Sequence, residues 1–301
     1  MKILCGTDFS VHAVEAGHAA AAIAASLKSE LILVHALDTS RYVDLSHELH
    51  EHFRHTRLSK LELEAKRLAR EGLSVSTRLV EGSPATCLVE AALEIQAGMI
   101  VVSSLGQIAP SRWFVGSVAE RTAQNASVAT LVVRQHKPLE SWALRKTSLN
   151  ILVGYDFSPS GDAALAWAAS LRSIGSCKFT VTYVAGRETE RWNSVMDYYS
   201  PSAIKALIAR DLEDVAKQVL GNAEFKTNVF AGIGRPDPQL VELAQAETAE
   251  LIVIGTNQKR GVNLLGSVSR GVLHHAATNV ICVPIGAAEL LMQPNRKGGA
   301  P

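Results

Sequence analysis

The chain has 301 residues, of which 47% are hydrophobic and 20% are charged, and its formal net charge is +1. This composition excludes a largely disordered protein, and the length fits about two globular domains. A net charge so close to zero provides no field that attracts a phosphate backbone or an anionic lipid surface, so neither nucleic acid nor a membrane is expected as a partner.

The four cysteines are scattered without a CxxC pair, at Cys5, Cys87, Cys177 and Cys282. We expect them to be reduced, and mostly core residues, in a cytoplasmic protein. A first strand that starts at Lys2 leaves no room for a signal peptide, and no apolar run has the length that spans a bilayer.

The first half alternates short apolar runs with longer helical stretches, the pattern of βαβ units around a parallel sheet. The predicted strands lie near 2–7, 30–36, 73–80, 98–103 and 128–134. They are mostly apolar without strict alternation, as expected for strands covered on both faces. The Ala-rich stretch 11–27 favours a helix, and 58–72 repeats leucines at helical spacing before a terminating Gly72.

The second half repeats the first. "ILCGTDFS" at 3–10 returns as "ILVGYDFS" at 151–158, and "VGSVAERTAQNASVATLVV" at 115–133 returns as "LGSVSRGVLHHAATNVICV" at 265–283. A repeat of this period indicates a domain fused to its copy. The second set of predicted strands lies near 150–155, 178–184, 226–231, 250–255 and 279–283.

This repeat predicts two doubly wound α/β domains, each with a five-stranded parallel sheet flanked by helices. We expect the first domain at 1–137, a linker at 138–147, the second domain at 148–288 and a flexible tail at 289–301. The fifth strands, "SVATLVV" and "NVICVPI", are apolar and would leave bare edges. We therefore expect them to pair with each other in an internal pseudo-dimer with approximate two-fold symmetry.

A sheet of this kind binds ligands beyond the carboxyl ends of its strands, where the strand order reverses. With the order 3-2-1-4-5, strands one and four flank that point. Strand one is followed by Asp8, and strand four by a loop from Ser103 that holds Gly106 and then Gly116-Ser117 before a helix.

That loop has the features of a phosphate site. A helix beginning at Gly116-Ser117 offers unpaired backbone N–H groups, and glycine lets a ligand approach closely. Asp8 can accept hydrogen bonds from a ribose or a base, and Val34, taken as the end of strand two, can offer backbone groups to an adenine. The alternative is that glycine and serine only cap the helix, and that Asp8 caps the helix near Val11.

The combination of "ILxxxDFS", a central "GxP" and a pattern close to G-x2-G-x9-G-[ST] resembles the universal stress protein family, in both halves and over almost the whole chain. The resemblance implies an adenine nucleotide alpha hydrolase-like fold with strand order 3-2-1-4-5 and dimerisation through the fifth strand, and it leaves a homodimer and an unknown protein partner open. In some members the signature holds ATP. The resemblance thus assigns the first site to Asp8, Val34, Gly106, Gly116 and Ser117, with ATP or ADP, and Mg²⁺ accompanying it.

Each half departs from the signature. Ser103 stands where the first glycine is expected, and its hydroxymethyl group is expected to crowd the nucleotide. The second half keeps Asp156, Gly255, Gly266 and Ser267, but Gln258 replaces the second glycine and the loop is two residues shorter. We therefore expect the N-terminal half to be the better site; Lys259 and Arg260 leave a smaller anion open for the second half.

No catalytic machinery is identified. The chain has no P-loop, no G-x-G-x-x-G after the first strand and no nucleophile elbow. Enzymatic turnover is not expected beyond slow hydrolysis of bound ATP, which positioned phosphates and Mg²⁺ permit without a dedicated base.

Two other functions remain open. "SHELHEHFRHTR" contains His47, His50, His52 and His55, which spread too widely around a helix to converge on one ion. Pairs of them can form half-sites, but we expect a solvated, charged helix face with adventitious nickel or zinc affinity. The other candidate is an interaction module with vestigial sites, whose aromatic surface would include Trp192 and Tyr198-Tyr199.

Overall fold

The computed structural model describes residues 1–38, 46–106, 115–185, 200–230, 235–257 and 265–287. Its N-terminal half contains β1 Lys2–Gly6, α1 Val11–Ser26, β2 Glu30–Leu37, α2 His47–Leu68, β3 Val75–Glu81, α3 Pro84–Glu94, β4 Ala97–Ser103, α4 Ser117–Asn125 and β5 Ala129–Val133. The five expected strands are all present at the expected places.

Helix α5 His136–Ala143 then leads into the C-terminal half. This half contains β6 Leu149–Gly154, α6 Pro159–Ser170, the short 3-10 helix η2 Leu171–Ser173, β7 Cys177–Val184, α8 Pro201–Leu220, β8 Glu224–Phe230, α9 Pro236–Ala246, β9 Leu251–Thr256, α10 Ser267–His275 and β10 Asn279–Pro284. The segment expected as a linker thus forms most of a helix, which packs against α1 and buries Leu139 and Trp142.

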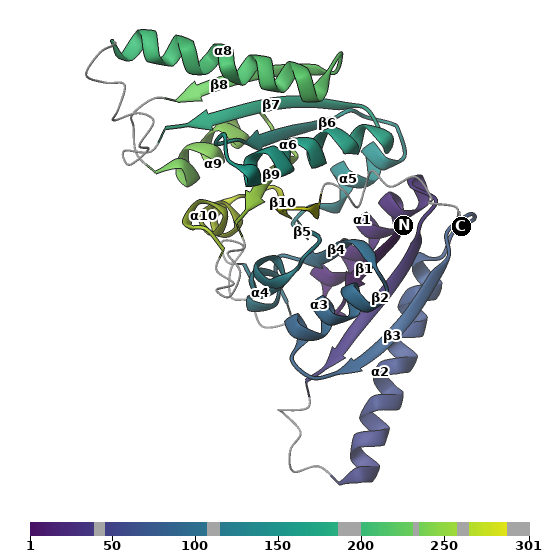
Figure 1. Cartoon of the computed structure of the whole chain (residues 1–301). Coiled ribbons are helices and arrows are strands. Elements are labelled where there is room, and N and C mark those ends of the chain that lie inside the picture. The colour runs from purple at the N-terminus through teal and green to yellow at the C-terminus, as the bar shows by residue number, and fades with distance from the viewer. Residues whose placement is uncertain (39–45, 107–114, 186–199, 231–234, 258–264, 288–301) are drawn as a thin grey trace, which may run out of the picture.

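The ten strands form one sheet in the order β3-β2-β1-β4-β5-β10-β9-β6-β7-β8 (Figure 1). Each half therefore has the expected order 3-2-1-4-5 with parallel neighbours. The halves join where β5 and β10 pair antiparallel, with Leu131 opposite Ile281. The predicted pairing of the two fifth strands is thus present, and each covers the other's edge.

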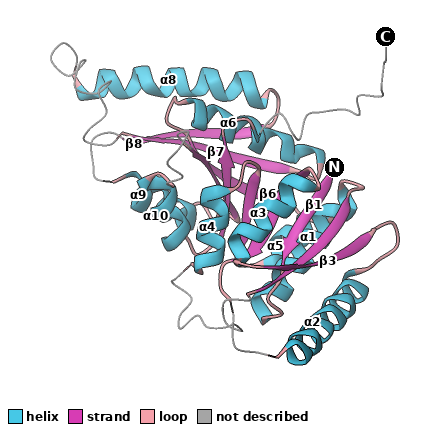
Figure 2. Ribbon diagram, turned by 60° about the horizontal axis from the view of Figure 1, so that its bottom comes forward, coloured by secondary structure: helices cyan, strands magenta, loops and turns pink. Residues whose placement is uncertain are grey.

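Helices cover both faces of the twisted sheet (Figure 2). One hydrophobic cluster lies on the side of α1, α2, α5, α6 and α8, and a second lies on the side of α3, α4, α9 and α10. Helix α1 buries six alanines between Ala16 and Ala24, because their small side chains let the helix lie close to the sheet.

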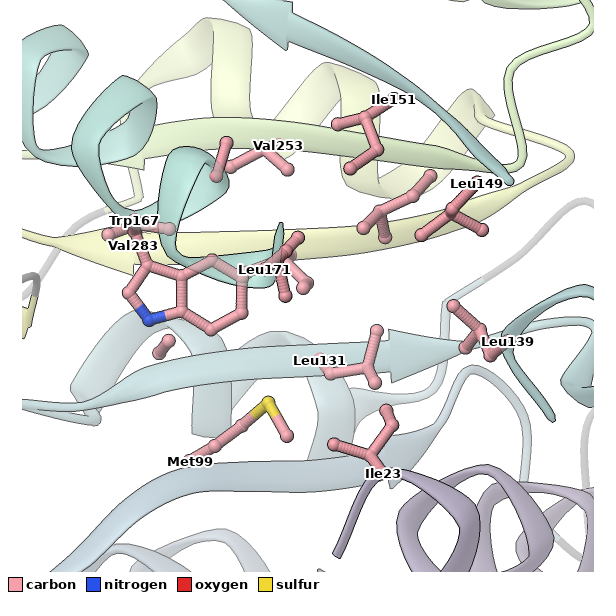
Figure 3. Packing of buried hydrophobic residues seen from close by; sticks show 14 of the residues in the cluster. Ile23, Met99, Leu131, Leu139, Leu149, Ile151, Trp167, Leu171, Val253 and Val283 are labelled. Carbon is pink, nitrogen blue, oxygen red and sulfur yellow. The ribbon is translucent and has the colours of Figure 1, made fainter. Parts of the chain in front are cut away.

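The first cluster continues across the seam between the halves. Figure 3 shows Met99 and Leu131 of the first half packed toward Trp167, Leu171 and Val283 of the second. Both Trp142 and Trp167 are buried in this cluster. The two halves therefore share one apolar core on this side of the sheet.

The structure corrects two expectations about local structure. Helix α2 begins at His47 and ends at Leu68, so Gly72, with φ +79°, lies beyond the helix and does not terminate it. Strand β2 continues to Leu37, so Val34 is not its end; the Val34 side chain is buried and its carbonyl accepts a hydrogen bond from the Thr7 N–H at 2.9 Å.

All four cysteines are free and buried, as expected. Burial raises the pKa of Cys5 and of Cys282 to about 12 and that of Cys177 to about 11. Within the described ranges, no helix is both long enough and apolar enough to cross a membrane.

Candidate functional site

The loop after β1 holds the Asp8 carboxylate at the carboxyl end of the sheet. Asp8 Oδ1 accepts a hydrogen bond from the Ser10 N–H at 3.0 Å, and Thr7 Oγ1 accepts one from the Phe9 N–H at 3.1 Å. Phe9 has a φ of +64°, in the left-handed region that a side chain adopts only when its surroundings hold it there. The N-cap of α1 is Ser10, whose Oγ accepts from Ala13 N–H, so Asp8 is not needed for that role.

Gly106 brings the loop after β4 against Asp8. A Cβ added to Gly106 would lie 2.9 Å from Oδ2 of Asp8, which is closer than real Cβ contacts allow. A side chain at Gly106 would therefore displace the carboxylate. The glycine allows this close approach, and its φ lies outside the left-handed region.

Gly116 brings the other end of the same loop to the same place. Its N–H donates to Ser104 O at 2.7 Å, and a Cβ added to it would lie 3.4 Å from that oxygen and 3.8 Å from Gly106 N. Gly116 is also the N-cap of α4, and it has no side chain with which to cap the helix. Ser117, the first residue of α4, is exposed.

Asp8, Gly106, Gly116 and the start of α4 thus lie close together at the carboxyl ends of β1 and β4, where the strand order reverses and doubly wound sheets have their binding crevice. The Asp8 carboxylate and the N-terminus of α4, with its partial positive charge and unpaired N–H groups, both lie there. Such a pair can bind a ligand that has hydroxyl or amino donors at one end and an anion at the other.

Ser103 makes a hydrogen bond within its own loop. Its Oγ donates to Leu105 O at 2.8 Å, and the residue is half-buried at the end of β4. This bond helps to hold the stretch that leads to Gly106. The structure thus gives the hydroxyl a stabilising contact that the sequence did not predict.

The second half repeats one contact of the first: Asp156 Oδ1 accepts from the Ser158 N–H at 3.1 Å, as Asp8 Oδ1 does from the Ser10 N–H. Asp156 Oδ1 also accepts from Ser158 Oγ and would lie 2.6 Å from a Cβ on Gly161, so this carboxylate lies against the start of α6. Gln258, Lys259 and Arg260 lie outside the described residues.

Gly255 is a packing residue. A Cβ added to it would lie 2.2 Å from Ser160 O and 2.4 Å from Ser160 C, both in the backbone of α6. Its own carbonyl accepts from Ser269 Oγ of α10 at 2.9 Å. Helix α6 thus lies directly on the carboxyl end of β9, where the equivalent residue of the first half, Ser103, has room for a side chain. Gly266 is the N-cap of α10, and Ser267 is exposed.

The model of the universal stress protein family matches residues 1–134 and 148–284, which is most of the chain and both copies of the repeat. The chain belongs to the universal stress protein family.

Relatives in this family match one or both halves. A universal stress protein of Methanocaldococcus jannaschii is 33% identical over 141 residues, which are 45% of this chain and 83% of that protein. One from Mycobacterium tuberculosis is 28% identical over 225 residues, or 69% of this chain and 68% of that protein. The structure of a universal stress protein from Archaeoglobus fulgidus has a TM-score of 0.68 at 16% identity, covering 95% of this chain and 96% of that one. The fold is the adenine nucleotide alpha hydrolase-like fold of this family.

Sequence reasoning missed the aromatic support under the first site. The rings of Phe9 and His35 lie 4.4 Å apart, and the Arg57 guanidinium carbon lies 5.9 Å from the Phe9 ring centre. His35 Nδ1 lies 2.7 Å from Thr7 O, a carbonyl, so Nδ1 donates. Burial, above all, lowers the pKa of His35. The sequence offered one sign of this arrangement, namely a histidine, His35, within an otherwise apolar strand.

The four histidines of the candidate metal segment lie along one helix. His47, His50, His52 and His55 all lie on α2, and His50 Nε2 lies 3.5 Å from Glu81 Oε1. Across the described ranges, no three His, Cys, Asp or Glu side chains gather in a way that suits a metal ion. The aromatic residues Trp192 and Tyr198-Tyr199 lie outside the described residues.

Proposed function

We propose that the N-terminal half binds an adenine nucleotide, ATP or ADP, at the crevice between β1 and β4. The phosphates lie at the N-terminus of α4, where Gly116 and Ser117 leave the backbone N–H groups accessible. Asp8 accepts hydrogen bonds from the ribose or the base, and Mg²⁺ enters with the phosphates. The function is nucleotide-dependent regulation in a stress response, through binding and not through rapid turnover.

The observation that carries this proposal is the contact of Gly106 with Asp8. It joins an acceptor for the nucleoside and a donor site for the phosphates in one crevice, because Gly106 also lies beside Gly116. In the second half, the close packing of Gly255 on α6 leaves less room for a ligand. This difference supports one nucleotide per chain.

The test is calorimetric titration of ATP and ADP into the full-length protein and matched variants. We expect about one site per chain, and we expect Gly116→Val to abolish it, because the side chain fills the approach to the α4 N-terminus. Gly116 has a φ of −65°, which a valine can adopt, so the fold is retained. The same change in the second half, Gly266→Val, is the control and should leave the affinity unchanged.

Any of three results contradicts the assignment. Unchanged ATP affinity in folded Gly116→Val shows that α4 does not hold the phosphates, and loss of binding in Gly266→Val moves the site to the second half. If the wild-type protein retains no nucleotide after purification, judged by mass spectrometry of an acid-quenched sample, and gives no heat with ATP, the protein is an interaction module.

A further inference from the structure

The seam between β5 and β10 brings equivalent residues of the two halves face to face. The copies are offset by 150 residues here, so Leu131 of the first half is equivalent to Ile281 of the second. These two residues are directly opposite each other in the antiparallel pair. The pseudo-two-fold axis therefore passes through this pair. A seam between two identical halves would place the same residue on both sides of the axis.

The polar contacts at this seam are made by unlike residues. Glu120 of α4 and Arg270 of α10 are equivalent by the same offset, and Arg270 Nε lies 2.8 Å from Glu120 Oε1. His274 Nε2 lies 3.2 Å from the other carboxylate oxygen of Glu120. Two N-terminal halves paired in this way would bring Glu120 toward a second Glu120, and two C-terminal halves would bring Arg270 toward a second Arg270. Like charges in such close proximity disfavour an interface.

A buried amide adds a second asymmetric contact. Asn279, at the start of β10, is fully buried. Its Oδ1 accepts hydrogen bonds from the N–H groups of Arg134 at 2.9 Å and Gln135 at 3.0 Å, just after β5, and its Nδ2 donates to Glu250 O at 2.9 Å. The amide of one half thus satisfies two backbone donors of the other.

Neither half makes the same pair of hydrogen bonds with its own copy. The residue equivalent to Asn279 is Ala129, so a second N-terminal half offers no such acceptor to the N–H groups of Arg134 and Gln135. The residues equivalent to Arg134 and Gln135 are Pro284, which has no N–H, and Ile285, so a second C-terminal half offers the Asn279 oxygen one donor in place of two. A buried polar group that loses its partner is costly.

We propose that the seam is selective for unlike halves. The edge of β5 together with the exposed side of α4 is a binding surface whose partner is the C-terminal half, and it is closed to a second N-terminal half. Glu120, Arg270 and Asn279 carry this selectivity. If two chains exchange halves, each seam in the resulting dimer still joins an N-terminal half to a C-terminal half.

The test uses the full-length chain with a cysteine reporter on the axis. In the native seam, a cysteine at position 131 faces Ile281 and has no thiol partner. In a seam between two N-terminal halves, it would face the same cysteine of the other chain. Position 131 and Cys282 lie on opposite faces of the sheet, so the reporter does not face Cys282. The protein is unfolded in urea, refolded and oxidised, and disulfide-linked dimers are counted. The same reporter, Leu131→Cys, is placed in a chain with Glu120→Gln, Arg270→Gln and Asn279→Ala, which makes positions 120 and 270 alike and position 279 like Ala129.

We expect the symmetrical chain to give at least about tenfold more dimer linked through position 131 than the chain that carries the reporter alone. Thr130→Cys, which faces Cys282 across the seam, is the positive control and should link within one chain. Equal dimer yields from both chains, whether high or low, overturn the assignment of selectivity to these three residues. If circular dichroism shows that the triple variant is unfolded, the chain with Glu120→Gln and Arg270→Gln alone makes the comparison.

Discussion

Gly255→Ser tests whether α6 lies on the end of β9 as closely as the structure shows. The substitution gives the second half the serine that the first half has at Ser103. The new Cβ would be 2.2 Å from Ser160 O, so the first turn of α6 must retreat by roughly 1 Å to restore an ordinary contact. Because the obstacle is backbone and not a flexible side chain, rotamer changes cannot relieve the clash.

We expect this change to lower the free energy of unfolding by about 3 kcal/mol, at the upper end of the range for overpacking. Gly255→Ala should cost the same, because the clash involves the Cβ. With a typical dependence on urea, the unfolding midpoint falls by about 1 M. The measurement is urea unfolding followed by the fluorescence of the buried Trp142 and Trp167.

The control is Gly266→Ser in the same half. A Cβ on Gly266 would have Ser269 Oγ as its nearest neighbour, at 3.9 Å, and serine is a better N-cap than glycine, so its midpoint should be unchanged or slightly higher. A midpoint for Gly255→Ser within error of the wild type would refute the packing described for α6 and β9. The second half would then have as much room for a ligand beside β9 as the first half has beside β4.

Three further predictions use other parts of the chain. Gly106→Ala should displace the Asp8 carboxylate and weaken ATP binding about tenfold at nearly unchanged stability, and an unaltered calorimetric affinity would contradict the proposed role of Asp8. Because burial lowers the pKa of His35 below its usual 6.5, the unfolded chain binds more protons than the native one just below that pH. Stability should therefore fall as the pH drops from 6.5 toward the lowered pKa, and His35→Gln should flatten this part of the urea midpoint profile; an identical slope would exclude His35 as its source. Thiol reagents should label neither Cys5 nor Cys282 in the native protein and both in urea, and rapid native labelling would show that these sites open easily.

Strand positions were predictable because each strand is a short apolar run between turn residues. The strand predicted at 30–36 matches β2, which ends at Leu37, but taking Val34 as its end was wrong. His35 follows Val34 within the strand, and its imidazole donates to Thr7 O, which satisfies the buried polar group. A hydrogen bond between distant segments cannot be derived from the local pattern.

Two other features depend on tertiary structure in the same way. The N-terminal part of α2 is rich in His, Glu and Arg and has no apolar periodicity, so the sequence indicated only the leucine-rich part of the helix. Gly255 matches the family signature in type and position, yet its packing is decided by the distance between α6 and β9. The residues of the first site were predictable, but the contact between Asp8 and Gly106 was not, because it depends on how two loops from different strands meet.

The antiparallel seam has a consequence for how the two crevices can be used. The two halves meet antiparallel, yet Glu120 in the first turn of α4 contacts Arg270 in the first turn of α10 across the seam. The helix N-termini that follow Gly116 and Gly266 therefore lie close to each other, on either side of the pseudo-two-fold axis. A charge bound at the start of one helix thus lies within electrostatic reach of the start of the other.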